Sequence, residues 1–298
     1  MTLHSQSGHD AALAIAGTGR MASALGALLS RCGIPILAVA GRSPHSTAEA
    51  VRFTGAARAV TFAELPAIAS RILIAVSDDA LPAVSSELAA AGLGGALVLH
   101  TCGAAGPAAL APLRAAANST GVLHPLQTVP SAEAGLLSLP GSTFAYAGDS
   151  AAAGWARQLI HLLGGEPLPV DATRWPLYHA AAVMACNYHA VLVDAALDLM
   201  ESAGIGRGPA LHALAPLIRA ATANILCAGP AQALTGPIRR GDAGTVASHM
   251  AALASSSPEI MHLYAVAGLR AVALATRAGL SAPAAARIQA ALEPPPLP

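Results

Sequence analysis

The chain has 298 residues, and its 16 basic residues balance its 16 acidic ones. Because no segment concentrates positive charge, we expect neither a nucleic-acid partner nor binding to an anionic membrane surface. All the basic residues are arginine, which excludes mechanisms that need a lysine, such as Schiff-base chemistry or a Walker-type phosphate contact.

The cysteines are far apart and form no Cys-x-x-Cys pair: Cys32, Cys102, Cys186 and Cys227. The start of the chain, Met1–Asp10, is polar and lacks the apolar core of a secretory signal. Both observations predict a cytoplasmic protein with reduced thiols.

Short β-type runs alternate with helical segments in the first half of the chain. The runs predicted as strands are Leu13–Ala16, Pro35–Ala40, Arg71–Val76, Ala96–His100, Thr120–His124, Thr143–Ala147 and Pro167–Val170. The amphipathic segments between them include Met21–Arg31, Ala80–Ala91 and Ala152–Leu163. This alternation predicts an α/β Rossmann domain over residues 1–171, with a mainly parallel, doubly wound sheet covered by helices.

The β-type pattern stops near Asp171, and the rest of the chain reads as helices. They are predicted over Pro176–Ser202, Pro209–Cys227, Ala243–Ala254, Glu259–Ala278 and Ala282–Leu292. We therefore expect an all-α domain over residues 172–298.

The stretch Ala180–Met200 is apolar enough to raise the question of a membrane span. Four polar residues interrupt it: Asn187, His189, Asp194 and Asp198. A spanning helix needs about 20 predominantly apolar residues. We therefore expect no membrane partner and interpret the stretch as a buried helix of a soluble protein.

A glycine-rich motif, Gly17-Thr18-Gly19-Arg20-Met21-Ala22, joins the first predicted strand to the first predicted helix. In this dinucleotide fingerprint the first glycine allows a tight turn, and the second lets the backbone approach a pyrophosphate. The small third residue lets helix and strand pack closely, and the helix N-terminus suits the phosphates. We predict that Gly17, Thr18, Gly19, Arg20 and Met21 bind a dinucleotide.

The residues at the end of the second predicted strand indicate whether the chain binds NAD(H) or NADP(H). A chain that binds NAD places Asp or Glu there, whereas this one has Gly41-Arg42-Ser43. Arg42 can pair with a 2′-phosphate and Ser43 can donate to it, so NADP(H) is favoured over NAD(H). The alternative is a solvated loop arginine.

Two more strand ends fall where a doubly wound sheet binds its ligand, outside the carboxyl ends of the strands. Val76 and Ser77 stand at the end of one predicted strand, and Thr101 follows the next. We include Val76, Ser77 and Thr101 among the predicted cofactor-binding residues.

Three stretches carry a resemblance beyond the generic fold. They are His124-Pro125-Leu126-Gln127-Thr128; Tyr178-His179-Ala180-Ala181-Ala182 with Asn187-Tyr188; and Thr235-Gly236-Pro237-Ile238-Arg239-Arg240-Gly241-Asp242 with Thr245 and His249. From Ala12 to about Leu292 the chain resembles a family of bacterial Rossmann-like proteins that are described as NADP-dependent oxidoreductases and end in a helical domain of unknown function. The resemblance implies a C-terminal domain like that of the 6-phosphogluconate dehydrogenase and ketopantoate reductase superfamily. It supplies no substrate.

One position departs from that superfamily, whose characterised members carry Lys-x-x-x-Asn on the first long helix of the second domain. Asn187 matches the asparagine, while Val183 stands at the lysine position. His179 lies on the same predicted helix face. We place His179 and Asn187 at a reacting centre; the alternative for His179 is a partnered core histidine.

The segment Thr235–Asp242 is predicted as a polar loop between helices. Arg239 and Arg240 are candidates to bind a substrate carboxylate or phosphate, with Thr235 and His249 beside them. Ordinary solvated arginines are the alternative. His124 is a candidate donor to a carbonyl or imine, and a structural His-Pro turn is its alternative.

These residues together predict an NADP-dependent oxidoreductase that transfers hydride to or from a small carbonyl, imine or hydroxy compound. The missing lysine favours an alternative, a non-catalytic NADP(H)-binding sensor or assembly protein; another type of Rossmann enzyme is a third possibility. The histidines form no His-x-x-x-His pair, so we predict no metal site. By analogy with the superfamily we expect a homodimer formed through the helical domain.

Overall fold

The structure is a computed structural model that describes residues 12–293. The polar start Met1–Asp10, on which part of the compartment prediction depends, lies outside the described residues. Contacts between residues divide the chain into two compact units, Met1–Ala185 and Cys186–Pro298.

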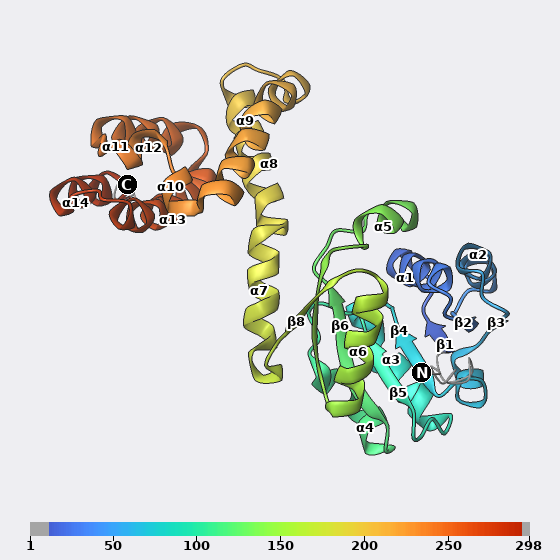
Figure 1. The fold of residues 1–298 in the computed structure, drawn as a ribbon. Helices are drawn as coiled ribbons and strands as arrows, with labels where there is room; N and C mark the ends of the chain where they lie inside the picture. Colours follow the sequence, from blue (N-terminus) through green and yellow to red (C-terminus); the bar gives the residue numbers. More distant parts are fainter. Residues whose placement is uncertain (1–11, 294–298) are drawn as a thin grey trace, which may run out of the picture. The chain divides into compact units, whose positions relative to one another are not determined.

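The first unit is built on one sheet with the order β3-β2-β1-β4-β5-β6-β7-β8 (Figure 1). The strands are β1 (Leu13–Ala16), β2 (Ile36–Ala40), β3 (Ala59–Val60), β4 (Arg71–Ile74), β5 (Leu97–His100), β6 (Ser119–Pro125), β7 (Thr143–Gly148) and β8 (Glu166–Pro169). All neighbours are parallel except β6 and β7. The predicted fold class, a mainly parallel doubly wound sheet, is confirmed.

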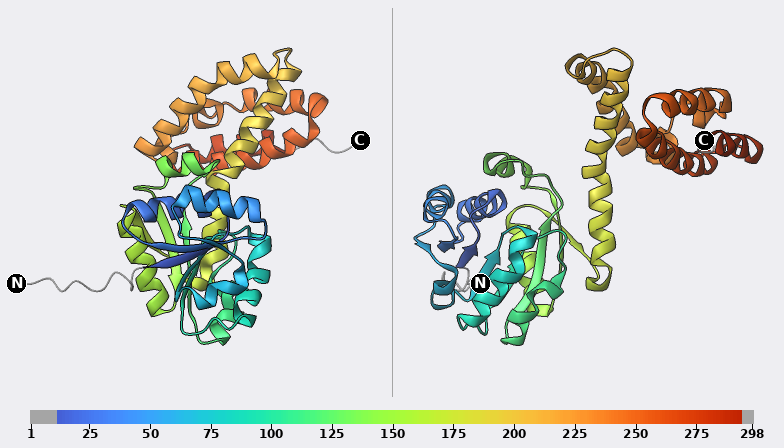
Figure 2. Two further views of the ribbon diagram at one scale, coloured as in Figure 1. Left: turned by 90° about the vertical axis from the view of Figure 1, so that its right-hand side faces the viewer. Right: turned by 180° about the vertical axis from the view of Figure 1, so that it is seen from behind.

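Helices cover both faces of this sheet (Figures 1 and 2). Those of one face are α1 (Arg20–Arg31), α2 (Pro44–Thr54), α5 (Ala132–Ser138) and α6 (Ser150–Leu162), and those of the other include α3 (Leu81–Ala90) and α4 (Ala111–Ala115). Strand residues alternate between the two layers, since Leu13 and Ile15 pack with α1 and α6 whereas Ala14 and Ala16 face the layer of α3. Burial on both faces explains why the strands are continuous apolar runs.

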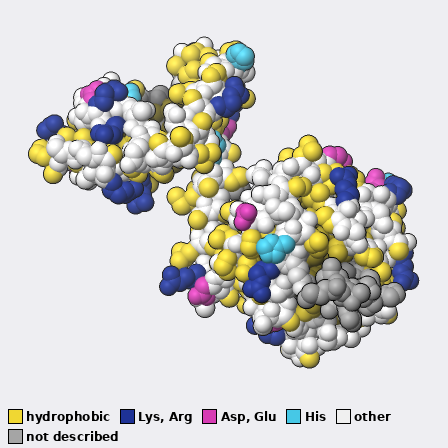
Figure 3. All heavy atoms as spheres, viewed as in Figure 1, with side chains coloured by type: hydrophobic (Ala, Val, Ile, Leu, Met, Phe, Trp, Pro, Cys, Tyr) yellow, Lys and Arg dark blue, Asp and Glu magenta, His cyan; other side chains and the backbone are white. Residues whose placement is uncertain are grey.

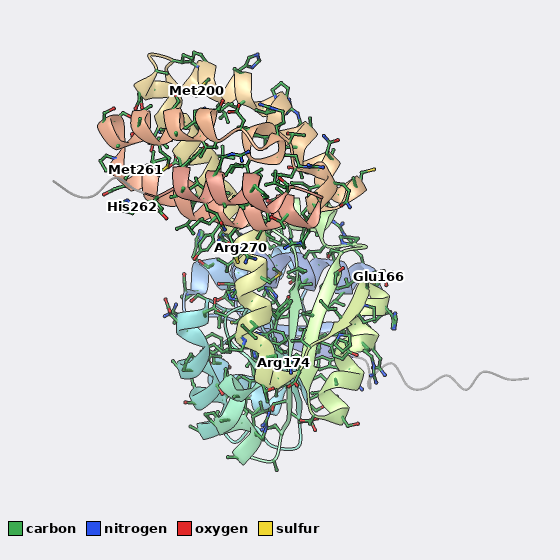
Figure 4. All side chains as sticks on the ribbon, turned by 90° about the vertical axis from the view of Figure 1, so that its left-hand side faces the viewer. Glu166, Arg174, Met200, Met261, His262 and Arg270 are labelled. Carbon is green, nitrogen blue, oxygen red and sulfur yellow. The ribbon has the colours of Figure 1, made fainter. Side chains whose placement is uncertain are left out.

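The first unit includes one helix beyond its last strand. After a short 3-10 helix (Ala172–Arg174), marked by Arg174 in Figure 4, the chain forms α7 (Trp175–Ala185). Trp175 is buried against side chains of β6 and β7, among them Val122 and Ala145. This packing groups α7 with the sheet, whereas the predicted boundary between residues 171 and 172 marks the change from strands to helices.

The second unit is all helical. It contains α8 (Asn187–Ser202), α9 (Arg207–Ala228), α10 (Pro230–Ala233), α11 (Gly236–Arg240), α12 (Ala243–Ser256), α13 (Pro258–Arg277) and α14 (Ala282–Ala291). Its core lies between the last helices, where Val246 and Met250 of α12 pack with Val272 of α13 and Ile288 of α14. The predicted helix Pro176–Ser202 is two helices, because the backbone departs from regular helix geometry at Cys186.

The long apolar helices have few intrachain contacts. Three helical stretches are long and apolar enough to cross a membrane by length and composition: Ala172–Ser202, which comprises the 3-10 helix, α7 and α8, then Arg207–Ala228 and Pro258–Arg277. Only 6% of the most apolar window of each of the first two is buried. The expectation that the first is a buried helix is therefore wrong for residues 12–293 of a single chain, which provide no layer that covers it. Hydrophobic side chains lie on the surface of α8 and α9 (Figure 3).

Candidate functional site

The turn after β1 has the backbone geometry that the glycine motif predicts. Gly17 has a φ of +135°, and its N–H donates to the carbonyl oxygen of Ala40 at 2.8 Å. A Cβ on Gly17 would lie 2.1 Å from the carbonyl oxygen of Ala75, so only glycine fits. Gly19 is the N-cap of α1, has extended backbone geometry, and nothing lies within 4 Å of where its Cβ would be. Its missing side chain therefore leaves open space at the N-terminus of α1.

The end of β2 presents Arg42 to solvent. A Cβ on the preceding Gly41 would lie 2.5 Å from Thr18 Cγ2, so the two turns are in close contact. Within residues 12–293 the guanidinium of Arg42 has no hydrogen bond or ion pair. Ser43 is the N-cap of α2, and its hydroxyl oxygen accepts from the N–H of Ser46 at 3.3 Å. The Ser43 side chain is thus already engaged in capping a helix.

These turns border a cleft of about 440 Å³. Its lining includes most of the predicted cofactor-binding residues: Gly17, Thr18, Gly19, Arg20, Met21, Arg42, Val76 and Ser77. Ser43 and Thr101 are not among them, and Thr101 is buried. The apolar part of the lining was not predicted from the sequence; Phe62, Ala80, Val84 and Val129 supply it. The described lining contains two arginines and no carboxylate, so its charge suits an anionic ligand. Its apolar part suits an apolar base on the same ligand.

A second group of polar side chains lies at the carboxyl ends of β5 and β6. The Nδ1 atom of His124 is 2.7 Å from the hydroxyl oxygen of Tyr178, which projects from the first turn of α7. The position of α7 is set by Trp175, whose indole N–H donates to the carbonyl oxygen of Gly103 at 2.9 Å. One buried tryptophan therefore brings Tyr178 to the end of β6.

His179 completes this group. Its ring centroid lies 6.0 Å from that of His124, and the rings meet edge to face. A Cβ on Gly103 would lie 2.7 Å from His124 Nε2 and 2.9 Å from His179 Nε2. The structure thus brings together His124 and His179, both predicted from the sequence, and adds Tyr178, which was missed as a site residue.

Burial keeps His124 and Tyr178 uncharged. It lowers the pKa of His124 to about 4, with His179 lowering it further and Asp78 opposing the shift. Burial also raises the pKa of the Tyr178 hydroxyl to about 12. Near neutral pH the pair consists of an intact phenol and a neutral imidazole, which can pass a proton without storing charge.

His100, one strand away from His124, is fully buried, and its Nδ1 atom has no hydrogen-bond partner among the described residues. Its Nε2 lies 3.2 Å from the carbonyl oxygen of Gly106. Burial lowers the pKa of His100 to about 4, despite the opposing effect of that carbonyl. His100 is therefore neutral in the folded protein.

We expect acid to destabilise the first unit through these histidines. Their folded pKa values of about 4 lie below the ordinary value of 6.5, so the unfolded chain binds more protons between these limits. The stability that each contributes above pH 6.5 should be lost as the pH falls towards 4, by up to roughly 3 kcal/mol for His100. His100→Leu should flatten the dependence of urea-unfolding free energy on pH in this window. A slope equal to that of the unaltered protein would contradict this account.

In the second unit, Asn187 is exposed at the start of α8. Asp194 and Asp198, on the same helix, both form ion pairs with Arg207. Asn187 belongs to a different unit from His124 and His179, and its predicted catalytic role stays a prediction.

The predicted loop Thr235–Asp242 is wrong, because it contains the short helix α11. Pro237 lies in its first turn, and Gly241 ends it in the left-handed conformation. Asp242 then caps α12, accepting from the N–H of Thr245 at 3.0 Å. These three residues turn the segment into a helix followed by a cap.

The predicted substrate-binding residues of this segment have different environments. Arg239 donates to the carbonyl oxygen of Ala278, just after α13, at 2.9 Å, whereas Arg240 is exposed. Thr235 borders an apolar cavity of about 220 Å³ that Tyr264 also lines, and His249 Nδ1 lies 2.8 Å from the Tyr264 hydroxyl. Arg240 is therefore the more available of the two arginines.

The part of the chain that the structure describes contains no group of three or more His, Cys, Asp or Glu side chains suited to a metal ion. All four cysteines are free thiols, and burial raises the pKa of Cys102 to about 12.

Solved structures with the same fold span nearly the whole chain. The proposed NADP oxidoreductase BF3122 of Bacteroides fragilis is 22% identical with a TM-score of 0.70, covering 89% of this chain and 99% of its own. Protein TM1727 of Thermotoga maritima is 20% identical with a TM-score of 0.69, with the same coverage. A reductive aminase of Aspergillus terreus, in complex with NADPH and ethyl-5-oxohexanoate, is 19% identical with a TM-score of 0.58, covering 95% of this chain and 92% of its own. At these identities the likeness establishes the fold alone.

Family models match two successive parts of the chain. A Rossmann-like domain matches residues 7–127, and a domain of unknown function, DUF2520, matches residues 142–271. No curated protein matches the sequence. The chain thus consists of a Rossmann-like domain followed by a DUF2520 domain.

Proposed function

We propose that the protein is an NADP(H)-dependent oxidoreductase that transfers hydride between the cofactor and a small carbonyl, imine or hydroxy compound. The observation that carries this proposal is the cleft, in which the glycine turn and two arginines border an apolar wall without a carboxylate. Gly19 fits the role of a phosphate-binding turn, because no packing in the chain requires a glycine there. When bound, the cofactor supplies the hydride, and the protein orients the substrate and handles the proton.

Three features support binding of the cofactor in this cleft. The N-terminus of α1, which has no side-chain cap, would hold the pyrophosphate beside Gly19. Phe62, Ala80 and Val84 offer apolar contacts to the adenine. The Arg42 guanidinium would pair with the 2′-phosphate, which distinguishes NADP(H) from NAD(H).

Arg42→Ala should weaken NADPH binding by about 10- to 100-fold, because a charge-assisted hydrogen bond contributes roughly 1.5–3 kcal/mol. NADH lacks the 2′-phosphate, so its affinity should change little. Calorimetric titration of both cofactors tests this. Arg52→Ala is the matched control, since Arg52 is an exposed arginine in the last turn of α2 and does not line the cleft. If Arg42→Ala weakened the binding of NADPH and NADH equally, the proposed contact between Arg42 and the 2′-phosphate would be wrong.

The relatives of the same fold support the redox chemistry. BF3122 is described as a proposed NADP oxidoreductase, and the Aspergillus reductive aminase was solved with NADPH and ethyl-5-oxohexanoate. We extend the cofactor and the class of small carbonyl or imine substrate from these proteins to this chain as a proposal.

The missing lysine favours a second candidate, a non-catalytic NADP(H)-binding sensor or assembly protein. Val183 stands where the superfamily has its acid/base lysine, and no other lysine exists in the chain. This candidate predicts tight NADPH binding without oxidation of NADPH by any member of a broad panel of ketones, aldehydes and imines. Turnover of any of them would exclude it.

We also propose that the protein is a cytoplasmic homodimer formed through the helical domain. The compartment proposal is supported by the widely separated free thiols. The dimer is supported by apolar side chains that a single chain leaves exposed, among them Leu217 and Leu226 of α9. A second copy is a better cover than a bilayer, because α8 also exposes Asn187, His189 and the two carboxylates that bind Arg207.

A further inference from the structure

Gly103, at the end of the segment that follows β5, is surrounded by side chains from two other elements. His124 approaches it from β6, while Trp175 and His179 approach it from α7. The φ of Gly103 is not positive, so the backbone itself does not require a glycine. What requires it is space, since a Cβ would lie within 3 Å of the Nε2 atoms of both imidazoles. The two rings thus contact a surface that only glycine leaves open.

Beside Gly103, Tyr178 and His124 form a hydrogen-bonded pair, with 2.7 Å between the Tyr178 hydroxyl oxygen and His124 Nδ1. His124 uses Nδ1 for this bond, which leaves Nε2 directed at Gly103. Both side chains are half-buried, and neither carries a charge near neutral pH. A half-buried phenol held by a neutral imidazole can donate a proton and recover it through the other ring nitrogen.

We propose that Tyr178 is the catalytic residue that gives a proton to the oxygen of a carbonyl substrate, and that His124 is the positioning residue that holds its hydroxyl and restores its proton. This rests on the proposed oxidoreductase function and narrows its substrate class. The carbonyl carbon accepts the hydride that the cofactor supplies, the C=O π electrons move to oxygen, and this oxygen takes the hydroxyl proton of Tyr178. His124 passes a proton from Nδ1 to the phenolate as Nε2 takes one from solvent. The carbonyl is thereby reduced to an alcohol, with the hydride coming from the cofactor and the proton from Tyr178.

The pair of Tyr178 and His124 lies at the carboxyl ends of the parallel strands, as the cofactor cleft does. β1, which leads into Gly17, and β6, which carries His124, are separated by β4 and β5. Neighbouring strands are about 4.8 Å apart, so this separation is about 14 Å. Gly17 and Gly19 would hold the pyrophosphate, and His124 and Tyr178 would then be the groups available for proton transfer at the ends of the neighbouring strands. Asp78, which follows Ser77 of the cleft lining, is close enough to influence the pKa of His124.

The donor separates substrates that still need a proton from those that already carry one. A carbonyl oxygen has lone pairs for the Tyr178 hydroxyl and needs a proton once hydride has been added. An iminium ion, the protonated form of an imine, already carries its proton and has no lone pair to accept a hydrogen bond. A neutral phenol with a neutral imidazole thus suits a ketone or aldehyde and offers an iminium ion no hydrogen bond.

The tautomer of His124 tests the arrangement without any substrate. Tyr178 can give its proton to a substrate only if Nδ1–H of His124 donates to the hydroxyl oxygen. We expect ¹⁵N NMR of histidine-labelled, NADPH-loaded protein to find the proton of His124 on Nδ1, with the signals assigned by their loss in His124→Gln. Tyr178→Phe should move that proton to Nε2. Tyr264→Phe, which removes the similar pair with His249 in the second unit, should leave the His124 signals unchanged. A proton on Nε2 in the NADPH complex would overturn the proposal.

Activity provides a second readout in the same samples, after NADPH binding has been measured. We expect a panel of small ketones and aldehydes that includes cyclohexanone to be reduced, and Tyr178→Phe to lower kcat by about 100-fold or more with NADPH affinity within about 2-fold. Reduction of a preformed cyclic iminium alone, or an unchanged kcat in Tyr178→Phe, would overturn the proposal while leaving the oxidoreductase function standing. Failure of the unaltered protein to bind NADPH would overturn both.

Discussion

Gly19→Ala should abolish tight NADPH binding while leaving the folded protein as stable as before. The backbone of Gly19 is extended, and its added Cβ would meet no atom within 4 Å. Alanine at such a position changes stability only slightly, by about 0.4–1 kcal/mol in its favour. The same Cβ would occupy the space through which a pyrophosphate approaches the N-terminus of α1. Loss of two phosphate hydrogen bonds would weaken binding on the order of 100-fold.

Gly17→Ala is the contrasting variant, because it should damage the fold as well. Its Cβ would lie 2.1 Å from the Ala75 carbonyl oxygen, and the φ of +135° is strained for any residue except glycine. We expect a loss of at least about 3 kcal/mol in unfolding free energy. Urea unfolding and NADPH titration of both variants separate the two effects. If Gly19→Ala bound NADPH as tightly as the unaltered protein, the turn would not be a phosphate site.

Most of the strands were predictable because they are buried on both faces; β8, which is largely exposed, is an exception. Each of the seven predicted runs overlaps a strand, since Leu, Ile, Val and Ala in short runs bounded by Gly, Pro or polar residues leave few alternatives. β3 was missed because two residues, Ala59–Val60, are too short to form a pattern. The helix α2 was missed because only Thr47, Ala50 and Thr54 are buried, which gives a weak apolar face.

The cleft was predictable because its determinants are local, whereas the second group of side chains was not. The glycine turn and Arg42 follow their strands directly, so spacing along the sequence places them together. Tyr178 reaches His124 only because Trp175 packs on the sheet and hydrogen-bonds Gly103, a contact between residues 72 positions apart. No periodicity carries that information. Similarly, the helix-capping role of Ser43 and the bond from Arg239 to Ala278 depend on local geometry that the residue types alone do not decide.

The misjudged burial of the long helices has a physical cause as well. An apolar helix is expected to be covered, but its sequence does not say whether the cover comes from the same chain. In this chain Leu217 of α9 is 64% exposed and Leu226 is 81% exposed. The two leucines are nine positions apart, so they lie on opposite sides of the helix. Both exposed sides of α9 need a contact surface. A second copy of the chain can provide both surfaces by packing around the helix.

The double variant Leu217→Glu/Leu226→Glu should convert the proposed homodimer into monomers. In a symmetric dimer the change removes four buried leucines, which together contribute roughly 6 kcal/mol or more, so the dissociation constant should rise by about 10⁴-fold. Analytical ultracentrifugation over a concentration series measures this directly. Leu137→Glu is the matched control, because Leu137 is 86% exposed on α5 of the first unit, outside the proposed interface. An unaltered protein that sedimented as a monomer and floated with lipid vesicles would mean that a bilayer covers α9 instead, because burial of these leucines in either medium satisfies the same hydrophobic requirement.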